Sequence, residues 1–307
     1  MPVYRLPADR RCGRRRTGAT EGAVTAYVRP RSLRDALRAR ADHPDWLVLA
    51  GGTDAMVGAV RRPRPPGVID LFGLPALTGI DRTAEGALRI GAATPFARIA
   101  RDDRLRAHAP ALAAAAREIG ALQIQARATI GGNVGTSSPV GDSLPVLLAL
   151  DAAIEVASVD GDRLVPYEEF CTGYRQTALR ADELIVAVRI PAAAAGLRQF
   201  WRKVGTRRAQ SISKVAIAAA ARVDASGVVT NARIGLGAVR DRPMRARAAE
   251  AEIIGQSPTA EIAQRAADAA LADIAPIDDV RSTADYRRTV AANLVRRFAM
   301  WLAQPGA

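Results

Sequence analysis

Apolar residues recur with two different periods along the chain, which predicts a mixed α and β fold. Short apolar runs of strand length occur at residues 26–28, 46–50, 68–71, 88–91, 154–156 and 184–190. Apolar residues at helical spacing predict helices between these runs, at residues 33–41, 95–100, 109–119 and 142–150. Ser32 stands where it can cap the first helix, and Asp142 and Ser143 open the last one. We therefore expect interleaved strands and helices.

The alanine-rich stretch at residues 191–196 breaks this pattern and predicts a linker. Beyond it, strand patterns come first and helix patterns follow, at residues 198–203, 213–222, 232–239, 246–254, 258–273 and 282–302. Three strands followed by three helices are typical of a small α+β domain. We predict one domain over residues 24–192 and a second over residues 197–303, built from a three-stranded antiparallel sheet plus helices.

Composition excludes several classes of protein. The 307 residues are 49% hydrophobic, which is enough for one large domain or two ordinary ones. No apolar run reaches the roughly 18 residues of a membrane helix, and the basic residues 10–16 precede no apolar segment of signal-peptide length. We expect a cytoplasmic protein with no membrane span.

The formal charge of +13 raises nucleic acid as a partner. The positive charge is almost all arginine, spread along the chain, and no recognition-helix, RNP or zinc-finger pattern accompanies it. We therefore expect no nucleic-acid partner. The one dense arginine cluster lies in the segment 1–23, which we expect to be a disordered basic tail.

Residues suited to metal binding or acid–base catalysis are scarce. Cys12 and Cys171 are the only cysteines, too few for an iron–sulfur cluster or a four-ligand zinc site. His43 and His108 stand in polar or alanine-rich surroundings without a carboxylate pattern. We expect no metal site and no catalytic residue in this chain.

Two glycine pairs, each directly after an apolar run, are the strongest candidates for ligand binding. The first lies in Ala50-Gly51-Gly52-Thr53-Asp54-Ala55 and the second in Thr129-Ile130-Gly131-Gly132-Asn133. Glycine admits positive φ and close approach of a ligand, and a nest of successive amides suits phosphate oxygens. Most such pairs only make turns, but the second is followed by three hydroxyl residues and neither contains Lys or Arg. We predict two turns that bind a diphosphate through neutral donors; neither has the spacing of a dinucleotide fingerprint or a P-loop.

These turns and the segments after them resemble the flavoprotein subunit of the xanthine dehydrogenase and carbon monoxide dehydrogenase family of molybdenum hydroxylases. The resemblance covers about residues 25 to 302. Beyond the turns it rests on motifs at residues 138–142, 144–151, 172–175, 182–185, 190–191, 203–208 and 279–282.

The resemblance implies an α+β fold with a two-lobed FAD-binding domain of the p-cresol methylhydroxylase (PCMH) type, followed by a domain like the C-terminal domain of the CO dehydrogenase flavoprotein. It implies FAD as cofactor and electron transfer as function. Electrons would arrive from the [2Fe-2S] clusters of a small partner subunit and leave to NAD, oxygen, a quinone or another carrier. A molybdopterin large subunit would complete a heterotrimer, expected to dimerise.

By position in the family motifs, the cofactor-binding residues would be Ala50, Gly51, Gly52, Thr53, Asp54, Ala55, Thr129, Ile130, Gly131, Gly132, Asn133, Asp142, Ile185 and Lys203. Asp142 would hydrogen-bond to the cofactor, or simply cap a helix. Lys203 would approach FAD from the second domain, or be a solvated strand charge. The loop at residues 205–214 lacks the aromatic that covers the isoalloxazine in some relatives. A stand-alone PCMH-type flavin oxidoreductase and a basic binding protein remain as alternatives.

Overall fold

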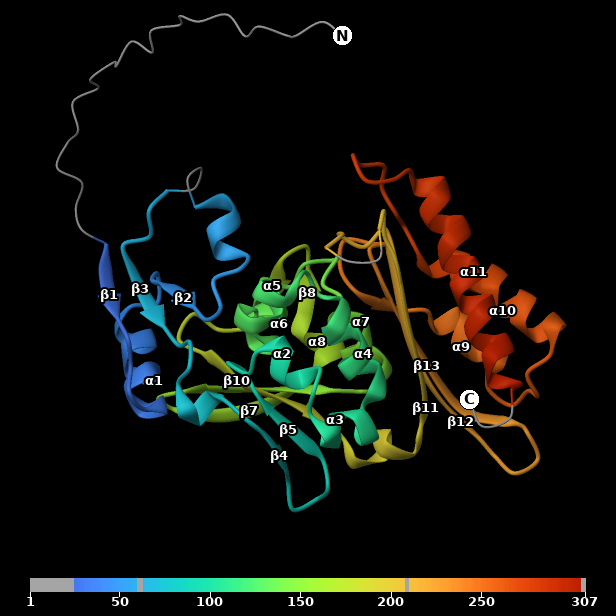
Figure 1. Cartoon of the computed structure of the whole chain (residues 1–307), viewed down its shortest axis with the longest axis horizontal. Coiled ribbons are helices and arrows are strands. Elements are labelled where there is room, and N and C mark those ends of the chain that lie inside the picture. The colour runs from blue at the N-terminus through green and yellow to red at the C-terminus, as the bar shows by residue number, and fades with distance from the viewer. Residues whose placement is uncertain (1–24, 60–62, 208–209, 305–307) are drawn as a thin grey trace, which may run out of the picture.

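The computed structural model describes residues 25–59, 63–207 and 210–304. The segment 1–23, expected to be a disordered tail, lies outside the described residues. Figure 1 shows the chain passing from a small N-terminal lobe through a central sheet with helices to a second domain at the opposite end. Within the described part, no helix combines the length and the apolar character that crossing a membrane requires.

The N-terminal lobe contains the parallel strands β1 (Ala26–Val28), β2 (Leu47–Leu49) and β3 (Gly67–Asp70), in the order β1-β3-β2. Helix α1 (Leu33–Asp42) connects β1 to β2. Ser32 caps this helix as predicted, because its hydroxyl oxygen accepts a hydrogen bond from the Asp35 amide at 3.1 Å. The short 3₁₀ helix η1 (Ala55–Gly58) follows the first glycine pair.

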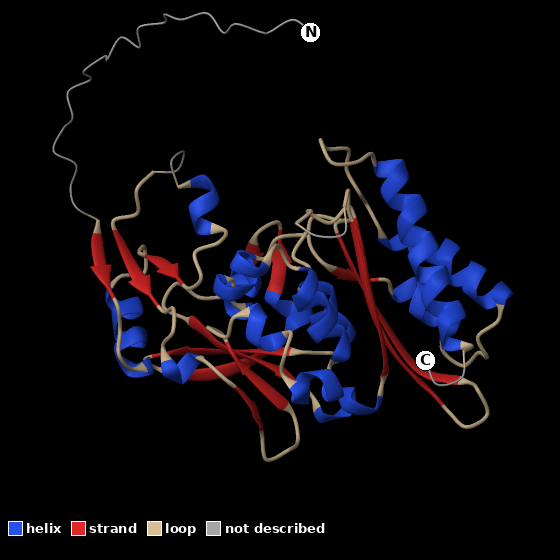
Figure 2. Ribbon diagram, in the orientation of Figure 1, coloured by secondary structure: helices blue, strands red, loops and turns tan. Residues whose placement is uncertain are grey.

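The central part of the chain is built on an antiparallel sheet of five strands, β4-β5-β10-β6-β7. Their bounds are Ile80–Arg82 (β4), Leu88–Gly91 (β5), Ala153–Ser158 (β6), Gly161–Pro166 (β7) and Leu184–Ile190 (β10). Helices gather on one side of this sheet (Figure 2). They are α2 (Phe96–Ile99), α3 (Asp103–His108), α4 (Pro110–Glu118), α5 (Leu122–Arg127), α6 (Ile130–Thr136) and α7 (Leu144–Ala149). The central part also contains two short helices and a two-stranded ribbon. These are η2 (Pro75–Leu77), α8 (Tyr167–Phe170) and the pair of β8 (Cys171–Gly173) and β9 (Gln176–Thr177).

The predicted linker forms the 3₁₀ helix η3 (Ala192–Gly196), and the second domain begins directly after it. Its sheet has the order β11-β12-β13-β14, with strands Arg198–Val204, Val215–Val223, Val229–Gly237 and Met244–Arg245. The prediction of three strands was wrong by one, because the two-residue β14 is too short to leave an alternating pattern. The predicted helices are α9 (Arg247–Ile253), α10 (Ala260–Asp273) and α11 (Ala284–Leu302).

One of the three buried hydrophobic clusters extends across both domains, whereas the second domain also has a cluster of its own. Trp201, Ala216 and Ala218 of the second sheet belong to the same buried cluster as Leu112 of α4 and Leu144 of α7. Contact with α7 is so close that a Cβ on Gly235 would lie 2.2 Å from the carbonyl oxygen of Pro145. Because interiors pack densely, this contact holds the second domain in a fixed place beside the first.

Candidate functional site

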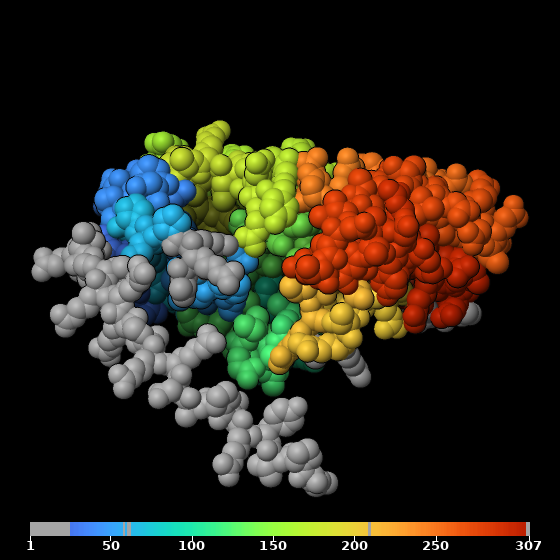
Figure 3. Space-filling model, turned by 90° about the horizontal axis from the view of Figure 1, so that it is seen from above, coloured from blue at the N-terminus to red at the C-terminus, as the bar shows by residue number. Residues whose placement is uncertain are grey.

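A large cavity of about 1270 Å³ contains most of the predicted cofactor-binding residues. Its walls come from the N-terminal lobe, the central part, and the loops and the start of helix α11 in the second domain. Figure 3 shows the lobe and the second domain at the two ends of the molecule, with the central part between them. Of the predicted residues, the lining includes Ala50, Gly51, Gly52, Thr53, Asp54, Ala55, Thr129, Gly131, Gly132, Asn133 and Ile185. Ile130, Asp142 and Lys203 do not line it.

The first glycine pair forms a turn after β2, as predicted. Each of its two positions requires glycine for a different structural reason. A Cβ on Gly51 would lie 1.9 Å from the carbonyl oxygen of Arg127, so no side chain fits there. Gly52 has a φ of +76°, a conformation that other residues rarely adopt. Within the described residues, the amides of Gly51, Gly52, Thr53 and Asp54 donate to no backbone acceptor. This turn is therefore the run of free donors that a phosphate requires.

The second glycine pair is not a turn, which corrects the prediction. Gly131 and Gly132 lie in the first turn of α6, where the hydroxyl of Thr129 caps the helix by accepting from the Gly132 amide at 3.1 Å. Two adjacent glycines weaken helix propensity, so the sequence pattern around Gly131 and Gly132 does not predict this helix. The cap and the contacts of α6 with its surroundings outweigh that weakness.

The amides at the start of α6 are already used inside the protein. The Ile130 amide donates to Thr94, the Gly131 amide to Ala92 and the Asn133 amide to Thr129, each to a carbonyl oxygen. The prediction of an amide nest was therefore wrong for this segment. What α6 offers to the cavity is the surface of its three glycines, Gly131, Gly132 and Gly135, and the side chains of Asn133 and Thr136.

An ion pair joins the first turn to the β8–β9 ribbon. The Arg175 guanidinium donates to the Asp54 carboxylate at 2.8 Å, and both residues line the cavity. Arg175 has a φ of +53° at the tip of the ribbon, and the neighbouring Tyr174 is exposed at the cavity. The motif at residues 172–175 was part of the family resemblance, but sequence reasoning gave neither residue a role.

Lys203 and Asp142 form a buried ion pair between the two domains. The ammonium Nζ lies 2.5 Å from Asp142 Oδ2 and donates to the Glu118 carbonyl at 3.2 Å. The Ser213 hydroxyl donates to the other carboxylate oxygen. Burial raises the pKa of the Asp142 carboxyl, while Lys203 and Ser213 oppose that rise.

This arrangement excludes the simpler alternatives for both residues. Lys203 is not a solvated charge, because its side chain is 5% exposed. Asp142 is not the helix cap, since α7 begins after Ser143 and has no side-chain cap. Both residues stand behind the cavity wall and connect the domains there.

The second-domain wall of the cavity is organised around Arg287, which sequence reasoning missed. Its guanidinium, 3% exposed as a residue, donates to the Ala238 carbonyl at 2.8 Å and to Asp279 at 2.7 Å. Burial by itself would raise the pKa of Asp279, but the Arg281 amide and the guanidinium groups of Arg287 and Arg281 lower it to about 2. An arginine inside a predicted helix carries no signal of such a role.

This lowered pKa predicts that Asp279 stabilises the protein at neutral pH and loses that effect in acid. Because the folded pKa lies below the ordinary 3.8, the contribution is complete above that value and disappears as the pH falls through about 2. Asp279→Asn should lower the urea midpoint at neutral pH, and its difference from the unchanged protein should shrink below about pH 4. Asp160→Asn, at an exposed turn, is the control; a difference for Asp279→Asn that is constant with pH would contradict the prediction.

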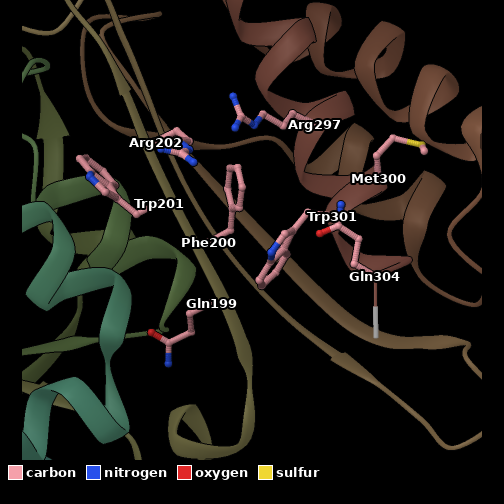
Figure 4. A pocket seen from close by; sticks show the side chains of 8 residues that line it. All are labelled: Gln199, Phe200, Trp201, Arg202, Arg297, Met300, Trp301 and Gln304. Atoms are coloured by element: carbon pink, nitrogen blue, oxygen red, sulfur yellow. The ribbon is translucent and has the colours of Figure 1, made fainter. Parts of the chain in front are cut away.

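A smaller hollow of about 490 Å³ lies between β11 and α11, away from the predicted residues. Figure 4 shows Phe200 and Trp301 facing one another across it, with Arg202 and Arg297 nearby. The two rings are tilted by 50° with centroids 5.5 Å apart, which is ordinary aromatic packing of a helix on a sheet. We assign this hollow to the packing of α11.

Known protein families match both domains. Residues 21–193 match the FAD binding domain in molybdopterin dehydrogenase, and residues 201–302 match the CO dehydrogenase flavoprotein C-terminal domain. Over 276 residues the chain is 32% identical to the xanthine dehydrogenase FAD-binding subunit of Escherichia coli O157:H7, covering 89% of this chain and 94% of the relative. It is 31% identical over 274 residues to the nicotine 6-hydroxylase medium subunit of Paenarthrobacter nicotinovorans, covering 88% and 94%.

Solved structures match both domains together, over 91% and 92% of this chain. A chain of the carbon monoxide dehydrogenase from Hydrogenophaga pseudoflava superposes with a TM-score of 0.85 at 32% identity, covering 91% of this chain and 97% of that one. Quinoline 2-oxidoreductase from Pseudomonas putida 86 contains a chain that matches with a TM-score of 0.85 at 27% identity, with coverage of 92% and 97%.

Proposed function

The chain belongs to the family of FAD-binding subunits of molybdenum hydroxylases, and from this premise we propose that it relays electrons from a [2Fe-2S] partner subunit to a terminal acceptor. It is an oxidoreductase subunit with FAD as cofactor. Bound FAD supplies the exchange between one-electron donors and two-electron acceptors that this relay needs. The protein supplies binding and orientation.

The observation that carries this proposal is the fit between the cavity and a flavin dinucleotide. The free amides of residues 51–54 suit diphosphate oxygens, and the bare Gly132 lets a ligand come close to α6. Ile185 adds an apolar side chain to the wall. Ile212, from the loop that carries an aromatic in some relatives, lines the cavity as well and offers an aliphatic surface for the ring system.

Asp142 and Lys203 would support the cofactor from behind this wall. Their buried pair connects the second domain to the loop between α6 and α7, whose residues 138–141 line the cavity. A buried ion pair broken on one side leaves an uncompensated charge, so the pair holds the loop firmly. Whether either side chain also contacts FAD is tested by the electron density of the FAD-loaded chain.

The partners we propose are a [2Fe-2S] small subunit and a molybdopterin large subunit, assembled in the cytoplasm as a dimer of heterotrimers. Several apolar side chains at the cavity are exposed to solvent, which supports the proposal that a partner subunit covers this surface. Val57 is 85% exposed, Ile277 69% and Ile212 50%, and all three line the cavity. Clusters of exposed apolar residues mark protein interaction sites.

Rapid mixing of the FAD-loaded chain with its reduced [2Fe-2S] partner subunit tests the relay. We expect the absorbance of oxidised flavin near about 450 nm to bleach within the mixing experiment, and to return when an acceptor is added. A basic binding protein would have no flavin spectrum. A chain whose flavin is not reduced by the partner, but is reduced directly by an organic substrate, would be a stand-alone oxidoreductase.

We expect FAD to be bound noncovalently. The described residues that line the cavity include no His or Cys, the side chains that commonly attach a flavin. Acid precipitation should therefore release all the flavin into the supernatant. Protein that remains yellow after precipitation and washing would contradict this prediction.

A further inference from the structure

The side-chain amide of Asn133 is held in one orientation by a residue of another helix. The hydroxyl of Ser143 donates to Asn133 Oδ1 at 2.7 Å. Ser143 itself is fully buried at the start of α7, whereas Asn133 lies in α6 and lines the cavity. An asparagine side chain has one acceptor oxygen and one NH₂ donor group. With the oxygen occupied by Ser143, the NH₂ group is the half of the amide that remains available.

This NH₂ group has no acceptor among the described residues of the protein. The backbone amides around it cannot replace it as a donor, because those of Ile130, Gly131, Gly132 and Asn133 already donate within the protein. The first turn of α6 therefore offers the cavity one polar donor whose direction is set from outside the helix. Oxygen atoms of FAD are acceptors that such a donor fits.

Ser143 is in turn held in place through its neighbour. Asp142 is anchored from the second domain by Lys203, at 2.5 Å, and by the Ser213 hydroxyl. These contacts fix the peptide between Asp142 and Ser143 relative to β11. The orientation of Asn133 thus depends on a buried network that spans both domains, and such networks fix geometry more strongly than isolated hydrogen bonds do.

We propose that Ser143 is a positioning residue of the FAD site, which turns the Asn133 NH₂ group toward an acceptor oxygen of the cofactor. This inference rests on the proposed binding of FAD in the cavity. It assigns to Ser143 a role that needs no contact with FAD. If Ser143 only satisfied its own buried hydroxyl, its removal would affect the stability of the protein and act independently of Asn133.

A double-mutant cycle on the full chain tests the proposal. FAD is removed, and its dissociation constant is measured by titration for Ser143→Ala, Asn133→Ala and the double variant. We expect each single variant to weaken FAD binding about five- to tenfold, the usual effect of one hydrogen bond. The double variant should bind no more weakly than Asn133→Ala, because Ser143 acts only through Asn133.

Additional variants keep the proposal falsifiable if Ser143→Ala folds poorly. Asn133→Asp retains the acceptor for Ser143 but replaces the NH₂ group by a second oxygen, so it should weaken FAD binding more than Asn133→Ala does. Ser143→Thr keeps the hydroxyl and should restore affinity. Ser137→Ala is the matched control, since this buried hydroxyl contacts Cys171 and not Asn133, and we expect a change within about twofold.

Three results would overturn the inference. One is an additive double variant, in which the losses of Ser143→Ala and Asn133→Ala multiply. Another is unchanged affinity in Ser143→Ala while Asn133→Ala loses FAD, which would leave the proposed cofactor site standing. The third is unchanged affinity in both variants, in which case both the inference and the placement of FAD beside α6 are wrong.

Discussion

Gly132→Val is expected to abolish stable FAD binding, raising the dissociation constant at least about 100-fold, while the chain still folds. The reason lies in what surrounds this glycine. A Cβ at Gly132 would meet only the Thr129 hydroxyl, at 3.0 Å, and its φ is not positive. The rest of a valine side chain would therefore enter the cavity beside α6, where a cofactor must pass close to the helix.

The other glycines provide a contrast. A Cβ on Gly51 or Gly131 would lie within 2.5 Å of neighbouring atoms, so valine at either position should prevent correct packing. Gly196→Val is the matched control, because Gly196 is exposed and a Cβ there meets only the end of the Arg222 side chain. Flavin content and thermal unfolding of the purified variants are the measurements. Normal flavin content in folded Gly132→Val would show that FAD does not bind against α6.

The isolated chain, fully loaded with FAD, is expected to oxidise no primary substrate. Its rate should lie at least about four orders of magnitude below that of the assembled hydroxylase. The described lining of the cavity has no histidine and no cysteine. Of its acidic residues, Asp54, Glu183 and Asp279 are held by arginines, whereas Asp45 and Asp241 complete the set. A histidine beside one of these carboxylates, a common acid–base arrangement, is therefore missing from the described lining.

Co-expression with the two proposed partner subunits should restore turnover, and the isolated chain should be less soluble or self-associate. Exposed apolar residues such as Val280, which is fully exposed, and Met56, which is 66% exposed, would then be covered in the complex. Metal analysis, pull-down and turnover of the co-expressed subunits are the measurements. Reduction of the flavin in the single chain by an organic substrate at the rate of the complex would refute the relay.

These two predictions depend on different parts of the chain. In the proposed site, binding of FAD depends on residues that face the cavity from α6 and the first glycine turn. The proposed electron transfer depends on partner subunits, which we expect to meet the outside of the same region. A variant such as Gly132→Val should therefore lose flavin without losing the partner subunits, provided that the surface around the cavity mouth is unchanged.

The sequence by itself determined the class of fold, the two domains and the family. Strand and helix periods depend on local alternation, so the pattern located α1, β5, β10 and the three C-terminal helices closely. The motif at residues 50–55 also identified a true glycine turn, because tight turns are encoded by the local need for positive φ at Gly52.

Only the tertiary structure decided how the second glycine pair and the charged residues are used. Gly131 is needed because it packs against Ala92, a residue distant in sequence, and its amide is consumed by that contact. Lys203 meets Asp142 across the domain boundary, and Arg287 meets Asp279 and Ala238. These hydrogen-bond and ion-pair partners are determined by the way the sheets and helices pack. The packing produces no periodic pattern in the sequence from which they could be predicted. Local sequence encodes local conformation, whereas burial and pairing across domains arise only when the chain is folded.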